Sequence, residues 1–271
     1  MDFKYHFLKG LSLIPGFLTI LLTSCNSPQG GNQIDRQQML AEATFVGMNS
    51  CISCHETEFQ LWKDSHHDLA MQKADSASIL GNFNNDVFTH KGVTTRFFKK
   101  DNDFLVNTQG KDGSNQDFKI IYTFGVFPLQ QYIVEFPNGA YQCLDIAWDS
   151  EKGQWFHLQP HMDLQPNEWI HWTSGGMRWN TACADCHSTD LRKNYDNETQ
   201  TFSTTYSEIN VACEACHGPA SFHVNYYEET GDTIAGNIPK LRMNTDLSSQ
   251  ELVDDCARCH SRRSQVTSWY D

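Results

Sequence analysis

The spacing of apolar and polar residues divides the chain into segments with different expected structures. Residues 56–73 contain no Gly or Pro, and Phe59, Trp62, Leu69 and Ala70 recur there at helical spacing. Apolar residues three or four positions apart share one face of a helix. We therefore expect an amphipathic helix over this segment.

A strand-like pattern replaces the helical one between residues 87 and 158. Three runs, 93–98, 117–122 and 131–136, are rich in β-branched and aromatic residues, and clusters of Asp, Asn, Gly and Pro separate them. This pattern is typical of strands joined by turns. We expect an antiparallel β-meander of about five or six short strands.

A helix start is visible near the C-terminus. Ser248 and Glu251 stand three residues apart, as in a capping box, where each side chain bonds the backbone of the other residue. A short helix is expected to follow and to lead into Cys256.

The first 25 residues have the pattern of an export signal. Lys4 and Lys9 precede an apolar run over residues 11–22, which is too short and interrupted to span a membrane comfortably. The run ends in Leu-Thr-Ser-Cys25, which resembles a bacterial lipobox, so Cys25 is expected to carry lipid. The alternative is an ordinary cleaved signal peptide.

Five segments are expected from these patterns. They are a lipoprotein signal peptide (1–25), a flexible Gly-, Pro- and Asn-rich tether (26–43), a first motif segment (44–86), a β-rich insert (87–160) and a second motif segment (161–271).

Charge and cysteine content narrow the class further. The 33 acidic residues outnumber the 20 basic ones, which argues against a nucleic-acid partner because phosphate binding needs clustered Lys and Arg. Ten cysteines are a high count, so their spacing decides the class. Cys143 lies in a strand-like run and is expected to be a small buried apolar residue.

Eight cysteines fall into four identical Cys-x-x-Cys-His motifs. This spacing supplies two thiols for thioether bonds to a porphyrin and one imidazole for its iron. We expect four covalently bound haem c groups, attached through Cys51, Cys54, Cys183, Cys186, Cys213, Cys216, Cys256 and Cys259, with His55, His187, His217 and His260 as iron ligands.

A zinc site and a redox dithiol are the alternatives for a single motif of this kind. Zinc ribbons do not require an adjacent His in each unit. Four motifs that all end in His, in a chain with an export signal, favour haem attachment.

The second axial ligand of each iron distinguishes an electron carrier from an enzyme. Seven histidines lie outside the motifs and after the signal, so every haem could have two histidine ligands. They are His66, His67, His90, His157, His161, His171 and His223. Met71 is a further candidate, and it would raise the potential of its haem.

Three stretches of the chain resemble the multihaem cytochromes grouped with cytochrome c-554. Residues 51–71 are similar to that family's first motif and the W-x-x-S-x-H-x-x-A segment after it. Residues 213–224 are similar to its C-x-x-C-H-G-P-x-x-x-H segment. Residues 179–189 resemble a subset with a β-rich insert between the first two haems.

The resemblance implies that His67 and His223 are distal iron ligands, each to a haem other than the nearest in sequence. His171 is similar to a recurrent position of the insert-bearing subset, and His90 and His157 match that subset more weakly as ligands. Members of the insert-bearing subset continue beyond the fourth motif, often with TPR repeats. This chain ends at Asp271, which leaves open that it is a truncated fragment.

On fold, we expect a mostly α or irregular core around the haems, with the antiparallel β-meander as an insert. On function, we expect an electron carrier of the periplasm or the outer face of the cell envelope, anchored to a membrane by lipid and serving other redox proteins.

Two other functions remain open. One is an oxidoreductase in which one haem lacks a distal ligand and acts on a small nitrogen or oxygen species, with His161 or Asp163 moving protons. The other treats residues 87–158 as a docking surface for a redox partner.

Overall fold

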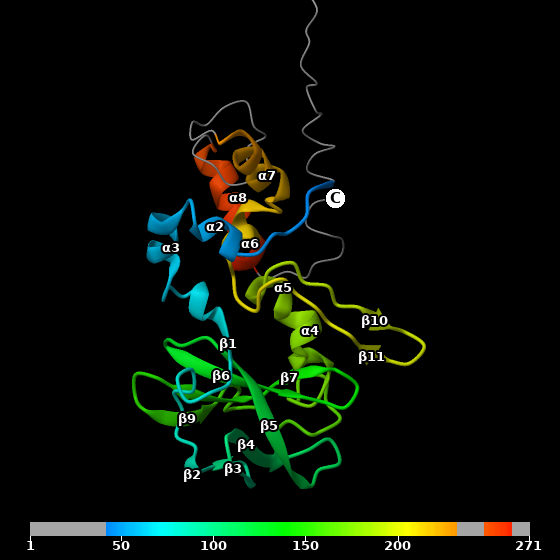
Figure 1. The fold of residues 1–271 in the computed structure, drawn as a ribbon. Helices are drawn as coiled ribbons and strands as arrows, with labels where there is room; N and C mark the ends of the chain where they lie inside the picture. Colours follow the sequence, from blue (N-terminus) through cyan, green and yellow to red (C-terminus); the bar gives the residue numbers. More distant parts are fainter. Residues whose placement is uncertain (1–41, 232–246, 262–271) are drawn as a thin grey trace, which may run out of the picture. The chain divides into compact units, whose positions relative to one another are not determined.

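The computed structural model of the chain describes residues 42–231 and 247–261 (Figure 1). Its largest element is an antiparallel sheet of nine strands. The strands are β1 (Met71–Lys73), β2 (Asn84–His90), β3 (Val93–Lys100), β4 (Asp103–Gln109), β5 (Asn115–Phe124), β6 (Leu129–Glu135), β7 (Tyr141–Cys143), β8 (Ile146–Asp149) and β9 (Gln154–His157). A separate hairpin pairs β10 (Tyr195–Asp196) with β11 (Thr201–Phe202).

The sheet follows the order of the chain almost throughout. Its main path is β2-β3-β4-β5-β6-β8-β9, with β1 paired to β5 and β7 paired to β6 off that path. The strand-like runs of the sequence lie within β3, β5 and β6, apart from Phe136 at the end of the third run. Short turns join most neighbours, and Lys91 and Gly92 both adopt positive φ in the turn between β2 and β3.

The helices of the described residues are short. They are α2 (Asn49–Ile52), α3 (Glu56–Trp62), α4 (Trp179–Ala182), α5 (Ala184–His187), α6 (Cys213–His217), α7 (Ser221–Thr230) and α8 (Ser249–His260), with 3-10 turns η1 (Asp68–Ala70) and η2 (Gly175–Met177). The predicted fold class, a mostly α or irregular core with a β insert, is therefore wrong: the sheet is the main structural element.

The error has a physical origin. A Cys-x-x-Cys-His motif needs only about one helical turn, so four motifs do not imply long helices. The β-branched and aromatic runs, in contrast, pair into continuous ladders, which makes the sheet larger than an insert.

The predicted helix over residues 56–73 is also too long. It ends at Trp62, because Asp64 adopts a positive φ of 61° and its backbone N–H donates to the Asp68 carboxylate at 2.9 Å. Such side-chain bonds compete with helical ones. The last three residues of the segment become β1, which pairs with β5.

Aromatic side chains fill one face of the sheet. The Phe83 ring meets Phe97, Phe104, Tyr132 and Trp155 edge-on, and the rings of Phe97 and Trp155 stack with centroids 3.5 Å apart. Each fully buried aromatic of this kind contributes about 1.5–3 kcal/mol. This face therefore has a core made entirely of side chains.

The second Cys-x-x-Cys-His motif packs on the other face of β6. Ile133 and Cys143 pack there with Trp179, Ala184 and Cys183. Asn180 is fully buried; it accepts a hydrogen bond from the Tyr141 backbone N–H at 2.7 Å. The prediction that Cys143 is buried is confirmed, since it is 1% exposed.

The capping box is confirmed as well. Ser248 Oγ accepts from the Glu251 backbone N–H at 3.3 Å, and the Glu251 carboxylate accepts from the Ser248 N–H at 2.8 Å. The predicted signal peptide, Cys25 and most of the tether lie outside the described residues. Within the described ranges, none of the helices combines the length and hydropathy needed to cross a membrane.

Candidate functional site

Each Cys-x-x-Cys-His motif lies on or beside a short helix. α5 and α6 carry the second and third motifs, the fourth ends α8, and the first begins in α2 and ends just before α3. Residues three apart lie on one side of a helical turn, so the two thiols of a motif can face one porphyrin edge. Among the described residues, none of the nine cysteines is in a disulfide.

The second and fourth motifs line one cavity of about 380 Å³, within the range of cofactor sites. The third motif contributes Cys216 to it. The cavity wall consists of His66, His67, Ala70, Gly125, Val126, Phe127, Asp185, Cys186, His187, Ser188, Asp190, Leu191, Val211, Ala215, Cys216, Asp255, Cys256, Arg258, Cys259 and His260.

The first and third motifs meet at a smaller cavity of about 150 Å³. Cys51 and His55 reach it from the first motif, and Cys213 and His217 from the third. His67 lines both cavities. The structure thus brings all four motifs, which are spread over the sequence, to two adjoining cavities.

Two pairs of histidine rings have the spacing that a metal ion between them would require. His55 and His223 lie with ring centroids 6.2 Å apart and planes inclined by 27°. His67 and His260 lie 6.1 Å apart. Histidine nitrogens bind metals at about 2 Å, and each ring centre is roughly 1 Å further back, so a bridged pair spans about 6 Å. The residues present therefore fit haem.

Lowered pKa values favour the neutral, metal-binding form of three histidines, His67, His187 and His223. Burial lowers the pKa of His67 and of His223, and neighbouring histidines lower each further. Burial lowers the pKa of His187 to about 4, and its Nδ1 is buried without a hydrogen-bond partner. A neutral imidazole offers a lone pair to a metal without first losing a proton.

Contacts between distant segments position His67. The Trp62 Nε1–H donates to the Val211 carbonyl at 3.0 Å, and the Asn210 amide donates to the Asp68 carboxylate at 2.9 Å. The Val211 N–H donates to the His67 carbonyl at 3.2 Å. The segment before the third motif therefore holds the segment after the first.

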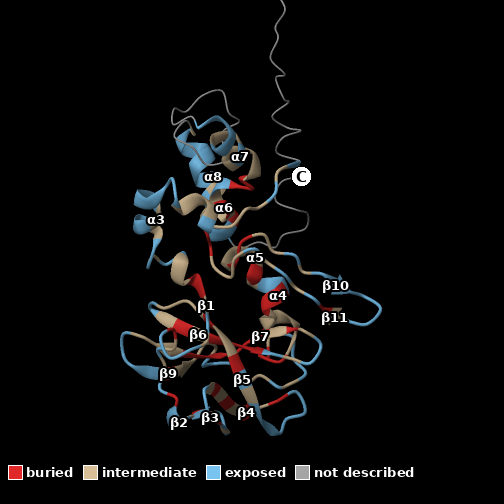
Figure 2. Cartoon of the chain, in the orientation of Figure 1, coloured by how far each residue is buried: buried red, intermediate tan, exposed pale blue. Residues whose placement is uncertain are grey.

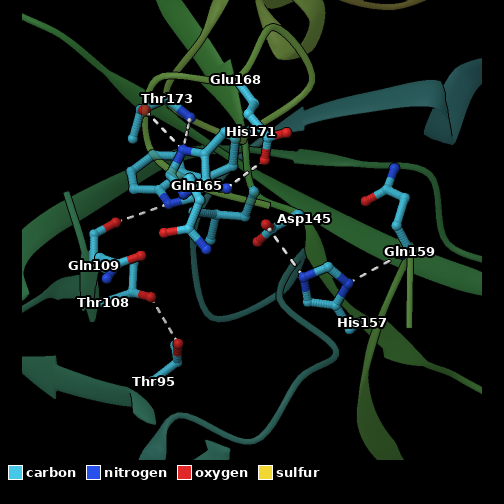
Figure 3. Close-up of polar contacts among 12 residues, drawn as sticks. Thr95, Thr108, Gln109, Asp145, His157, Gln159, Gln165, Glu168, His171 and Thr173 are labelled. Atoms are coloured by element: carbon cyan, nitrogen blue, oxygen red, sulfur yellow. Dashed lines mark hydrogen bonds and ion pairs between the residues drawn. The ribbon is translucent and has the colours of Figure 1, made fainter. Parts of the chain in front are cut away.

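The other predicted ligands lie elsewhere. His90 and His157 stack on each other in the sheet, with ring centroids 4.2 Å apart. His157 pairs with Asp145 at 3.3 Å (Figure 3). His171 is buried, and its Nδ1 bonds Thr173 Oγ1 at 2.8 Å. Among the described residues, no ring contact joins these three to a motif histidine, so their role as ligands stays a prediction.

The remaining candidate iron ligands, His66, His161 and Met71, differ in their surroundings. His66 lies on the wall of the larger cavity, His161 is exposed, and Met71 is buried at 1% exposure in the core beside the second motif. Cys143 Sγ lies 4.0 Å from Cys183 Sγ.

Sequence reasoning missed Glu214 and Phe124. The Glu214 carboxylate accepts hydrogen bonds from the backbone N–H groups of Val46, Gly47 and Ala220 at 2.8–3.1 Å. The Phe124 ring meets His187 edge-on at 4.3 Å. A charged residue inside a motif was the available signal for Glu214; nothing in the sequence marks Phe124.

Comparison with known proteins also supports haem binding. The family described as cytochrome c554 and c-prime matches residues 50–91 and 150–218. The stretch that it omits contains β3 to β8, so most of the sheet lies outside the family match. No match is found among curated proteins.

One solved structure shares the fold. The crystal structure of the outer cell wall cytochrome OcwA aligns with a TM-score of 0.50 and 20% sequence identity over 80% of this chain. The aligned part is 37% of the OcwA chain, so the present chain spans well under half of that protein's length. Together with the four Cys-x-x-Cys-His motifs, the match to the cytochrome c554 and c-prime family supports a multihaem c-type cytochrome, which implies covalently bound haem c.

Proposed function

We propose that the chain is a tetrahaem conduit that transfers electrons between redox proteins of the cell envelope. Its four motifs would each bind one haem c through their cysteines, with His55, His187, His217 and His260 as the first axial ligands. The family supports electron transfer as the general role. The number of haems and the place in the envelope are the specific parts of the proposal.

The pairing of histidine rings carries the proposal. His223 faces His55, and His67 faces His260, at separations that suit two imidazoles on one iron. An iron with two histidine ligands has no open position for a substrate. Such sites accept and release electrons without binding a reactant, as a carrier requires.

The chain's own residues would fix the spacing of the sites. Bound haem supplies the one-electron chemistry. The hydrogen bonds of Trp62 and Asn210 hold His67 between the two cavities, and Glu214 joins the residues before the first motif to the third motif. Fixed, adjoining sites favour passage of electrons from one to the next.

Location and partners follow from the N-terminal pattern. An export signal ending at Cys25 would place the protein outside the cytoplasm, on a lipid anchor, where it could meet other redox proteins. The resemblance to an outer cell wall cytochrome agrees with an extracytoplasmic site.

A second candidate function rests on His187. Its ring faces Phe124 rather than another histidine within the described residues. A haem held by His187 alone on one side would have an open position and could bind a small nitrogen or oxygen species. This would make the protein an enzyme or a ligand sensor.

Spectra of the purified holoprotein test both functions. We expect four haems per chain, low-spin absorption in both oxidation states, and no reaction of the reduced form with carbon monoxide. A chain with fewer haems contradicts the tetrahaem proposal, and a fraction that binds carbon monoxide supports the open site.

Ligand variants sharpen the test. His67→Ala and His223→Ala should each convert about one haem to a high-spin form that binds carbon monoxide. His66→Ala is the matched control, because His66 adjoins His67 but faces Phe127 instead of a motif histidine. Unchanged spectra in His67→Ala and His223→Ala would exclude these two residues as ligands.

A further inference from the structure

We propose that Cys143 and Cys183 form a disulfide before haem is attached to the second motif, and that this bond must be reduced before Cys183 can bind haem. Cys143 thus gains a function although it lies outside the four motifs. The inference rests on the proposed haem binding, because Cys183 is one of the two cysteines that would hold the second haem. It adds a redox control over haem attachment.

The sulfur atoms of the two cysteines are close neighbours. Cys143 Sγ and Cys183 Sγ lie 4.0 Å apart, although the two residues are 40 positions apart in the chain. The S–S distance of a disulfide is about 2.0 Å, and rotation of a cysteine side chain between staggered rotamers moves its sulfur by roughly 3 Å. The remaining gap is therefore of the size that a side-chain rotation covers.

Contacts that do not involve haem hold the two cysteines in place. Cys143 is the last residue of β7, and Cys183 follows α4 directly. α4 lies against β7 (Figure 1), and its buried Asn180 accepts a hydrogen bond from the Tyr141 N–H at 2.7 Å. The core of the sheet region therefore positions both thiols.

The side chain of Cys183 packs in this core rather than on the cavity wall. Cys186 and His187 of the same motif line the larger cavity, whereas Cys183 packs with Cys143 and Trp179. A thioether bond to haem and a disulfide to Cys143 exclude each other, because each uses the one free valence of the Cys183 sulfur. The two bonds are therefore alternative states of one residue.

The two thiols differ in their access to solvent, which sets the order of reaction. Cys143 is 1% exposed, whereas Cys183 is partly exposed. The hydrogen bond with Cys143 also lowers the pKa of Cys183, which favours the thiolate that reacts in thiol–disulfide exchange. An oxidant from solution would therefore react with Cys183 first, and Cys143 would react only with the product.

The oxidant that this chemistry requires is another disulfide, of the kind present in oxidising compartments outside the cytoplasm. The Cys183 thiolate attacks one sulfur of that disulfide and breaks its S–S bond, which forms a mixed disulfide and releases one thiol. Cys143 then loses its proton, attacks the Cys183 sulfur and releases the second thiol. The two cysteines lose two electrons and two protons in total, and the oxidant gains them as two thiols. A dithiol reductant reverses both steps.

Mass spectrometry of the full chain tests the disulfide. The chain is produced without haem attachment, treated with oxidised glutathione, blocked with N-ethylmaleimide and digested with trypsin. We expect a linked pair of peptides that joins residues 120–152, with Cys143, to residues 179–192, with Cys183. Dithiothreitol should separate the pair.

Cysteine variants assign the bond, because Cys183 and Cys186 lie in the same peptide. The linked pair should disappear in Cys143→Ala and in Cys183→Ser. It should persist in Cys186→Ser, which is the matched control from the same motif. Absence of the pair in the wild type, or its persistence in Cys183→Ser, overturns the inference.

Haem attachment tests the control that the disulfide exerts. The wild type and Cys143→Ala are produced in cells that attach haem, with oxidised glutathione or with dithiothreitol in the medium, and the mass of the whole chain gives the number of haems. With oxidised glutathione, we expect part of the wild-type protein to lack the second haem and Cys143→Ala to retain more of it. With dithiothreitol, both should carry the same number.

Cys143→Ser guards against an effect of packing, because it keeps the size of the side chain and should behave like Cys143→Ala. Equal loss of the second haem in the wild type and in both variants under oxidising conditions overturns the inference.

These outcomes differ from a failure of the proposed function. The peptide experiment needs no haem and tests the disulfide by itself. A wild-type protein that lacks the second haem even with dithiothreitol overturns the proposed function. Four haems per chain without a linked pair of peptides in the haem-free chain overturn the disulfide alone.

Discussion

The sheet and the segments that carry the haem motifs obtain their stability in different ways. Phe97, Val106 and Tyr132 are fully buried inside the sheet region, whereas α3 and α7 bury none of their residues. Figure 2 shows buried residues concentrated on the strands and on α4 and α5. A segment that buries little apolar surface cannot offset the entropy of ordering its chain. The sheet has a core of its own, whereas we expect the motif segments to need haem to complete theirs.

The second motif lies between these extremes. α4 and α5 pack on β6 through Trp179 and Ala184, both fully buried, so this motif shares the core of the sheet. The first, third and fourth motifs lack such support, and Cys54, Cys256 and Cys259 are exposed. The contrast predicts that haem matters least for the order of the second motif.

The largest expected effect comes from preventing haem attachment. In a variant with all eight motif cysteines changed to alanine, amide hydrogens of α6, α7 and α8 should exchange rapidly, because their core is missing. Those of β3 to β6 should stay protected. Hydrogen exchange with mass spectrometry measures both regions in one experiment.

Cys143→Ala is the control for that variant, since Cys143 lies outside the motifs. It should keep all haems and the protection of both regions. Equal protection of the helices with and without haem would show that the comparison is wrong, as would a loss of protection in the sheet.

The next effect is confined to the sheet. Phe97→Ala removes a ring that stacks on Trp155, and loss of a buried Phe typically costs about 3–5 kcal/mol. The free energy of unfolding of the sheet, measured with denaturant, should fall by that amount while the haem spectrum stays unchanged. Val87→Ala, at an exposed site, should have little effect. A changed haem spectrum would mean that the two regions are not separate.

A smaller effect is expected where the regions join. Asn180→Ala leaves the Tyr141 N–H buried without its acceptor, a loss of about 1–3 kcal/mol. Because Asn180 lies three residues before Cys183, this variant should lower the stability of the sheet and also perturb one haem. Thr181→Ala, next to it and exposed, is the control. If only the stability of the sheet changes, the boundary between the two regions lies between α4 and the second motif.

The smallest effect concerns acidity. Burial lowers the pKa of His171, opposed by Asp145 and Glu168 and assisted by His157, on which His90 stacks. The unfolded chain takes up this proton near pH 6.5 and the folded chain only at lower pH. Stability from this group is thus complete above about pH 6.5 and is lost as the pH falls through the folded value.

Urea unfolding at pH 7.5 and pH 5.5 measures this loss. The difference between the free energies of unfolding at the two pH values should be smaller in His171→Gln than in the wild type. An identical difference in both proteins would assign the acid sensitivity to other groups.

Local features of the fold could be predicted from the sequence, but the relative extent of helix and sheet could not. Runs of β-branched and aromatic residues between turn residues located β3 and β5, and three-residue spacing located the capping box of α8. Residues 71–73 looked helical because the bonds that make them a strand come from β5, fifty residues later. Pairing between distant segments leaves no trace in local periodicity.

The same limit applies to the site. The motifs are visible because their chemistry requires a fixed spacing. Which histidine meets which motif depends on tertiary contacts such as those of Trp62 and Glu214, so spacing alone could not pair His55 with His223. The sequence shows that Glu214 and Arg258 lie inside motifs, but it does not show that they are buried.

The bond between Gly47 and Glu214 has a consequence for the order of assembly. Its partners are 167 residues apart. At typical rates of synthesis, roughly 10–30 s pass between the appearance of the first motif and that of the carboxylate that anchors it. The complete sheet emerges within this interval. The first motif therefore gains its final surroundings only when the third motif arrives.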